Sequence, residues 1–205
     1  MIPVLAAQDP IAACQWLADQ FGFAQVAPGL MAFGAGLVAV VPGADVPGNL
    51  IPLALDHVAF QVADADAVFH RFSAAGAQLD PAFTPDGPRD IPQFWDHGVR
   101  FVFFQGPEGA PFEFCAINNG PVDRGHSHFA IRANDLDAAE RLVAGFGAKL
   151  IARHLLPGGL RPVSVRFLQS GPDLFELFDE APVVQPKPRL GWVGFLPDAT
   201  QVHPI

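Results

Sequence analysis

The chain has 205 residues, of which 50% are apolar and only 16% are charged. This composition supports a packed core and excludes a disordered chain. The formal net charge is −9, from 21 acidic and 12 basic residues. Such a charge does not indicate nucleic-acid binding, and an anionic membrane surface would repel the protein.

Residues 1–50 predict a short unit that begins with a strand over residues 2–6. A helix is expected over residues 11–21, with Asp9 as its N-cap, and two short strands close the unit. The first strand carries no His and the last carries no acidic residue.

Residues 51–120 predict a unit of the type β-α-β-β-β. It opens with a strand over residues 55–62, rich in β-branched and aromatic residues, and continues with a helix capped by Asp64 or Asp66. A loop rich in Pro, Asp and Gly (residues 80–98) separates this helix from the closing strands.

Residues 121–182 repeat that order. The second copy opens with Ser-His-Phe-Ala-Ile-Arg-Ala-Asn-Asp-Leu-Asp-Ala from Ser127, and the first with Asp-His-Val-Ala-Phe-Gln-Val-Ala-Asp-Ala-Asp-Ala from Asp56. In the second copy Asp135 or Asp137 caps the helix. The chain therefore contains a duplicated unit, and residues 1–50 are a degenerate third copy without metal ligands.

Residues 183–205 form the last segment. They are rich in proline and show little hydrophobic periodicity, so we expect a C-terminal tail that packs over the body or over a neighbour.

Each of the two full copies has a His on its opening strand and a Glu between apolar residues on its closing strand. These four residues are His57, Glu113, His128 and Glu176. A single His or Glu on a strand usually has an ordinary structural partner. Here the same two types occupy corresponding positions twice, and a carboxylate between apolar neighbours needs a cation to offset its desolvation. The pattern predicts a shared site for a divalent metal.

The chain resembles the vicinal oxygen chelate superfamily, which includes glyoxalase I, methylmalonyl-CoA epimerase, extradiol dioxygenases and bleomycin- or fosfomycin-resistance proteins. The resemblance covers residues 51–180 and extends to 1–50 as a minor module. The matching segments are Asp56-His57-Val58, the run from Pro107 to Glu113, His128 with its Asp135-Leu136-Asp137, and Phe175-Glu176-Leu177. The turn before Glu113 reads Gly-Pro-Glu-Gly where the family usually has Asp-Pro-Asp-Gly.

The resemblance implies an α+β fold in which tandem βαβββ modules form a curled mixed sheet around a metal cleft. It makes His57, Glu113, His128 and Glu176 the ligands of a divalent nickel, zinc, iron, cobalt or manganese ion. A set of two His and two Glu resembles glyoxalase I, a lyase or isomerase that acts on a small oxygenated substrate through an enediolate or enolate. Glu176 or Glu113 would then be the catalytic base.

Two alternatives stay open. An extradiol-type iron(II) ring-cleaving dioxygenase uses two His and one Glu, and Glu113 weighs against it because that position is normally not a ligand there. A resistance-type protein would bind a small molecule without catalysis.

Three further residues are candidates for substrate binding. By strand alternation Arg132 faces the cleft, where it would receive an anionic group or pair with a neighbouring acid. Trp95 and Arg100 lie in or after the long loop and would form a lip of the pocket. His126 shares the parity of His128 and is expected at the rim.

The remaining expectations concern the setting of the protein. No apolar run approaches the roughly 18 residues of a membrane span, and the start lacks the basic region of a signal peptide. Cys14 and Cys115, the only cysteines, fit a reduced cytoplasmic compartment. We expect a small-molecule substrate, no nucleic-acid or membrane partner, and a homodimer because the short first unit leaves a strand edge open.

Overall fold

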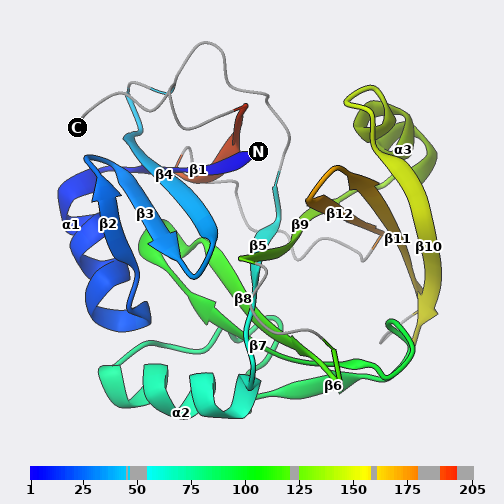
Figure 1. Cartoon of the computed structure of the whole chain (residues 1–205), viewed down its shortest axis with the longest axis horizontal. Helices are drawn as coiled ribbons and strands as arrows, with labels where there is room; N and C mark the ends of the chain where they lie inside the picture. The colour runs from blue at the N-terminus through cyan, green and yellow to red at the C-terminus, as the bar shows by residue number, and fades with distance from the viewer. Residues whose placement is uncertain (45, 47–54, 121–124, 158–160, 180–189, 198–205) are drawn as a thin grey trace.

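Two mixed β-sheets organise the protein (Figure 1), one of eight strands and one of five. The computed structural model describes residues 1–44, 46, 55–120, 125–157, 161–179 and 190–197. In Figure 1 the eight-stranded sheet curls from β6 and β7 at the bottom to β10 on the right.

The eight-stranded sheet joins the two full units through their opening strands. Its strands in spatial order are β10 (Lys149–Leu156), β11 (Val163–Ser170), β12 (Asp173–Phe178), β9 (His126–Arg132), β5 (His57–Gln61), β8 (Pro111–Ile117), β7 (Val99–Gln105) and β6 (Arg89–Ile91). The central strands β5 and β9 run antiparallel, and each runs parallel to the closing strand of its own unit, β8 or β12. This arrangement confirms the predicted curled sheet of tandem modules.

The helices of the two units cover the outer face of this sheet. Asp64 caps α2 (Ala65–Ala75) by accepting a hydrogen bond from Ala67 N at 3.0 Å. Asp135 caps α3 (Leu136–Ala144) through Ala138 N at 2.9 Å. The first of the two Asp residues in each copy is therefore the cap, because its side chain reaches the unpaired N–H groups of the first turn.

The five-stranded sheet belongs to the N-terminal unit. Its order is β13 (Gly191–Leu196), β1 (Ile2–Ala7), β4 (Gly36–Pro42), β3 (Leu30–Phe33) and β2 (Ala24–Ala27). Helix α1 (Pro10–Trp16) continues into the π-helical turn η1 (Leu17–Phe21). β1 runs parallel to β4 and antiparallel to β13, so β1 has the same kinds of neighbours as β5.

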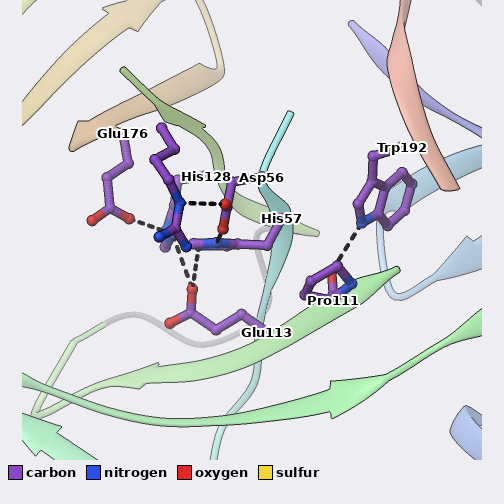
Figure 2. Close-up of polar contacts among 8 residues, drawn as sticks. Asp56, His57, Pro111, Glu113, His128, Glu176 and Trp192 are labelled. Atoms are coloured by element: carbon purple, nitrogen blue, oxygen red, sulfur yellow. Dashed lines mark hydrogen bonds and ion pairs between the residues drawn. The ribbon is translucent and has the colours of Figure 1, made fainter. Parts of the chain in front are cut away.

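Strand β13 lies in the segment expected to be a tail. Five of its six residues pair with β1, and Trp192 Nε1 donates a hydrogen bond to Pro111 O at 2.9 Å (Figure 2). The described part of the segment is therefore a strand of the N-terminal sheet. Its pairing partner lies at the other end of the chain, so local periodicity did not reveal it.

Strand alternation divides the aromatic residues between two faces. On β8, Phe112 and Phe114 point to the outer side, where their rings lie 5.3 and 5.2 Å from that of Phe21 in η1. Glu113 and Cys115 point to the inner face. Burying each Phe contributes about 1.5–3 kcal/mol. A one-residue slip of β8 would turn both rings onto the inner face and place the Glu113 carboxylate among the outer rings.

None of the helices in the described part of the chain has the length and apolar character needed to cross a membrane.

Candidate metal centre

The four predicted ligands lie together on the inner face of the curled sheet. His57 is on β5, Glu113 on β8, His128 on β9 and Glu176 on β12, which are the four central strands. One ligand atom from each residue lies within 4.8 Å of the others. All four residues are buried, with exposed fractions of 4 to 8%.

Two alanines explain why these side chains converge. Ala59 lies opposite Glu113 on one neighbouring strand and opposite His128 on the other. Ala130 is opposite His57 and Glu176 in the same way. Both alanines are fully buried, and their small side chains leave space in front of the sheet for the four longer ones.

The contacts within the cluster are unequal (Figure 2). Glu113 Oε2 lies 3.2 Å from Nε2 of His57 and 3.0 Å from Nε2 of His128. Glu176 Oε2 lies 2.7 Å from Nε2 of His128. Glu113 thus contacts both imidazoles, whereas Glu176 contacts one.

The cluster fits a divalent cation. Both imidazole Nε2 atoms are buried and close to carboxylate oxygens, but within the described residues neither is aligned for a hydrogen bond with them. A buried nitrogen without a hydrogen bond is costly. Two imidazole nitrogens and two carboxylates that converge on one point match the ligands of zinc, nickel and iron.

Burial and neighbouring charges shift the pKa values of the cluster in opposite directions. Burial alone would lower the pKa of His57, but the carboxylates of Asp56 and Glu113 raise it to about 9. Burial also opposes the charge on His128, but Glu113 and Glu176 raise its pKa to about 10. Burial would raise the pKa of Glu113, but the two imidazoles lower it to about 2. Without a metal, the site is therefore a set of imidazolium–carboxylate pairs.

A second set of contacts is made by Nδ1 of each imidazole, on the side of the ring away from the cluster. Asp56 Oδ1 lies 3.0 Å from His57 Nδ1, and Ser127 Oγ lies 3.3 Å from His128 Nδ1. These contacts leave both Nε2 atoms facing the cluster. Backing of this kind orients histidine ligands in metal proteins.

The three residues predicted to bind substrate lie in different places. Arg132 Nε donates to Asp56 Oδ2 at 2.8 Å, so it forms the salt bridge that was the alternative to substrate binding. Arg100 points to the outer face, where its guanidinium donates to Asp66 of α2 at 2.8 Å and to Asp90 at 2.8 Å. It therefore does not line the inner face, because strand alternation turns it away from Phe101 and Phe103.

Trp95 lies in the long loop on the inner side of the sheet. Its ring is 5.0 Å from that of Phe167 on β11, and the neighbouring ring of Phe94 is also 5.0 Å from Phe167. The loop of the first unit thus reaches the strands of the second.

Aromatic rings form the walls around the cluster. Phe103 lies 4.7 Å and Phe178 6.0 Å from the His57 ring, and Phe167 lies 6.1 Å from the His128 ring. A site surrounded by apolar rings strengthens the electrostatic interactions within it.

Sequence reasoning missed three residues near the site. Asp56 and Ser127 were part of the matched openings, and their position next to a ligand His was the available signal. His154 on β10 packs 5.0 Å from Phe94, on the same face as Ala152 and Leu156. Alternation along β10 would have placed it there.

His126 does not lie at the rim. Ser127 is the extra residue of a β-bulge in β9, because the pairing with β5 slips by one residue there. The slip turns His126 to the outer face, where its ring lies 5.2 Å from that of Phe60. Burial lowers the pKa of His126 to about 4.

Comparison with known proteins gives structural matches only. No protein-family model matches the chain, and no curated protein matches it. Glyoxalase I from Zea mays superposes with a TM-score of 0.62 and 16% identity, over 86% of this chain and 65% of that one. A mutant of 4-hydroxymandelate synthase from Streptomyces coelicolor gives a TM-score of 0.56 and 13% identity, over 87% and 69% of the two chains.

A Bacillus subtilis protein provisionally assigned as a dioxygenase also superposes, with a TM-score of 0.56 and 13% identity over 90% of this chain and 64% of its own. The chain thus spans about two thirds of the length of these proteins. At such identities the similarity shows a common fold.

Proposed function

We propose that this chain, which has the vicinal oxygen chelate fold, is a metal-dependent lyase or isomerase of the glyoxalase I type. The observation that carries the proposal is the buried set of two His and two Glu within 4.8 Å. An oxygenase site with three protein ligands does not need a second Glu. A cleft that binds an apolar molecule without metal needs none of the four residues.

His57, Glu113, His128 and Glu176 would hold the metal. A bound divalent cation would supply positive charge that stabilises a negative oxygen on the substrate. The chain itself supplies the walls that exclude water, with Phe103 and Phe178 on one side and Phe167 on the other.

We assign the general base to Glu176. Its carboxylate contacts a single imidazole and is the more exposed of the two, at 11% against 6% for the side chain of Glu113. Glu113 is held between both imidazoles, so it is less free to rotate toward a substrate. A carboxylate that can move within hydrogen-bond reach of a carbon-bound proton next to a carbonyl is suited to abstract it.

A ring-cleaving dioxygenase is the second candidate. The superposition on a protein provisionally assigned as a dioxygenase favours it, and the aromatic walls would accept an aromatic ring. The position of Glu113 at the centre of the cluster argues against a dioxygenase. A protein that binds a small molecule without metal is the third candidate.

Elemental analysis of protein purified without added metal separates the three. About one equivalent of nickel or zinc per chain, with turnover of a 2-oxoaldehyde and a thiol that requires no dioxygen, would support the isomerase. Iron together with oxygen consumption on a catechol would replace it with the dioxygenase. No metal, and no binding of added cobalt or zinc, would leave only the binding protein.

A further inference from the structure

The two carboxylate oxygens of Asp56 contact two different side chains. Oδ1 lies 3.0 Å from His57 Nδ1, and Oδ2 accepts a hydrogen bond from Arg132 Nε at 2.8 Å. In Figure 2, Asp56 and Glu113 lie on opposite sides of the His57 ring. The side chains of Asp56 and Arg132 are only 16% and 19% exposed.

The contact between Asp56 and Arg132 joins the two units. Asp56 directly precedes β5, and Arg132 is the last residue of β9. The strands hold the two residues close, since Asp56 N donates to Ala130 O at 2.8 Å. The Arg132 guanidinium lies 4.9 Å above the ring of Phe178, so the second unit fixes it from below.

We propose that Asp56 is a positioning residue that sets the tautomer of His57, and that Arg132 decides which atom of the residue 56 side chain faces His57. A carboxylate only accepts hydrogen bonds, so it keeps the proton of neutral His57 on Nδ1 and leaves the lone pair on Nε2, toward the metal centre. The inference rests on the proposed metal site and deepens it.

The other imidazole lacks this control. His128 Nδ1 faces the hydroxyl of Ser127 at 3.3 Å, and a hydroxyl both donates and accepts. The hydroxyl therefore does not select a tautomer of His128. The two histidines thus occupy equivalent positions in the duplicated sequence, but different groups contact their Nδ1 atoms.

Replacing Asp56 by Asn has a consequence that depends on Arg132. The Arg132 Nε–H is a permanent donor, and Asn has a single carbonyl oxygen. If that oxygen stays on Arg132, the amide NH2 faces His57 Nδ1 and stabilises the tautomer with the proton on Nε2. That tautomer cannot bind a metal through Nε2.

The test is a cobalt(II) titration of the full chain, followed by the visible absorption of the bound ion. It compares the unmodified protein with Asp56→Asn, Arg132→Met and the double variant. Asp56→Asn should weaken cobalt binding by about 10- to 100-fold. Arg132→Met should change it by less than about threefold, because the carboxylate still serves His57. The double variant should bind at least about fivefold more tightly than Asp56→Asn, because the amide oxygen is then free to face His57.

Asp80→Asn is the matched control. Asp80 is buried at 5% exposure, and its carboxylate accepts from Ala82 N at 2.8 Å. Asn keeps that bond and removes a charge that interacts with Asp56 and His57, so cobalt affinity should stay within about threefold if hydrogen bonding to His57 is what matters.

Two outcomes would overturn the positioning role while the metal site stands: Asp56→Asn binding cobalt as tightly as the unmodified protein, or the double variant binding as weakly as Asp56→Asn. A merely structural salt bridge predicts the second outcome, since each substitution would break it. An unmodified protein that binds no cobalt would instead overturn the proposed function, and this inference with it.

Discussion

The carboxylate of Glu113 lies 3.0 Å from Nε2 of His128, and the two residues come from different units of the duplicated pattern. Neither unit alone contains the complete cluster. The pairing of β5 with β9 brings the units together, so the site is complete only when both units are joined in the eight-stranded sheet.

Ala130→Leu should abolish metal binding. Ala130 is opposite His57 and Glu176 in the sheet, and a Leu side chain would occupy the space in which the ligand side chains meet. Overpacking costs about 1–3 kcal/mol, which urea denaturation would measure. Ala116→Leu is the control, because buried Ala116 lies on the outer face of β8. It should lose similar stability and keep the metal; equal metal loss in both variants would speak against the assignment.

Metal affinity should rise steeply with pH. His57 and His128 have pKa values of about 9 and 10 without metal, and a histidine must lose its proton before it binds a metal. Binding at neutral pH therefore releases about two protons, and the affinity should increase by up to about 100-fold per pH unit until pH 9–10. Calorimetry in buffers of different ionisation enthalpy would count the protons; a count near zero would exclude this ligand pair.

The metal-free protein should lose stability in alkali. The folded pKa values of His57 and His128, about 9 and 10, exceed the ordinary value of 6.5, so their contribution is complete below pH 6.5 and is lost as the pH rises to 9–10. For Glu113 the folded pKa of about 2 lies below the ordinary 4.5, so its contribution is present above pH 4.5 and is lost toward pH 2. Urea midpoints at pH 6 and pH 10 should differ in favour of pH 6, and the double variant His57→Ala, His128→Ala should lack that difference.

Glu176→Gln and Glu113→Gln should have different effects. If Glu176 is the base, Glu176→Gln should keep about one metal per chain and lower the rate of proton abstraction by about 10²- to 10⁴-fold. Glu113→Gln removes the carboxylate that contacts both imidazoles and should weaken the metal more than Glu176→Gln does. Exchange of the substrate proton with deuterated solvent measures the step, and unaltered exchange in Glu176→Gln would remove that residue from the role.

The duplicated openings and the alternation of strands were sufficient to predict the four-residue cluster. Asp64 and Asp135 follow their His at the same distance, and both cap helices as expected. These features depend on local sequence and on one repeated pattern.

The remaining features depend on contacts between distant residues. Strand β13 contains two glycines in six residues, a composition that disfavours a strand, and it forms because β1 pairs with it. The orientation of His126 depends on a bulge at Ser127 that alternation does not predict. Alternation turned Arg132 correctly toward the inner face, but its hydrogen bond to Asp56 involves a residue of the other unit, which alternation does not predict.

Equilibrium dialysis of the metal-stripped protein against zinc tests the central claim most directly. We expect one tightly bound ion per chain for the unmodified protein and none for the folded double variant His57→Ala, His128→Ala. An unmodified protein that binds no zinc, or a double variant that still retains one ion per chain, would contradict it.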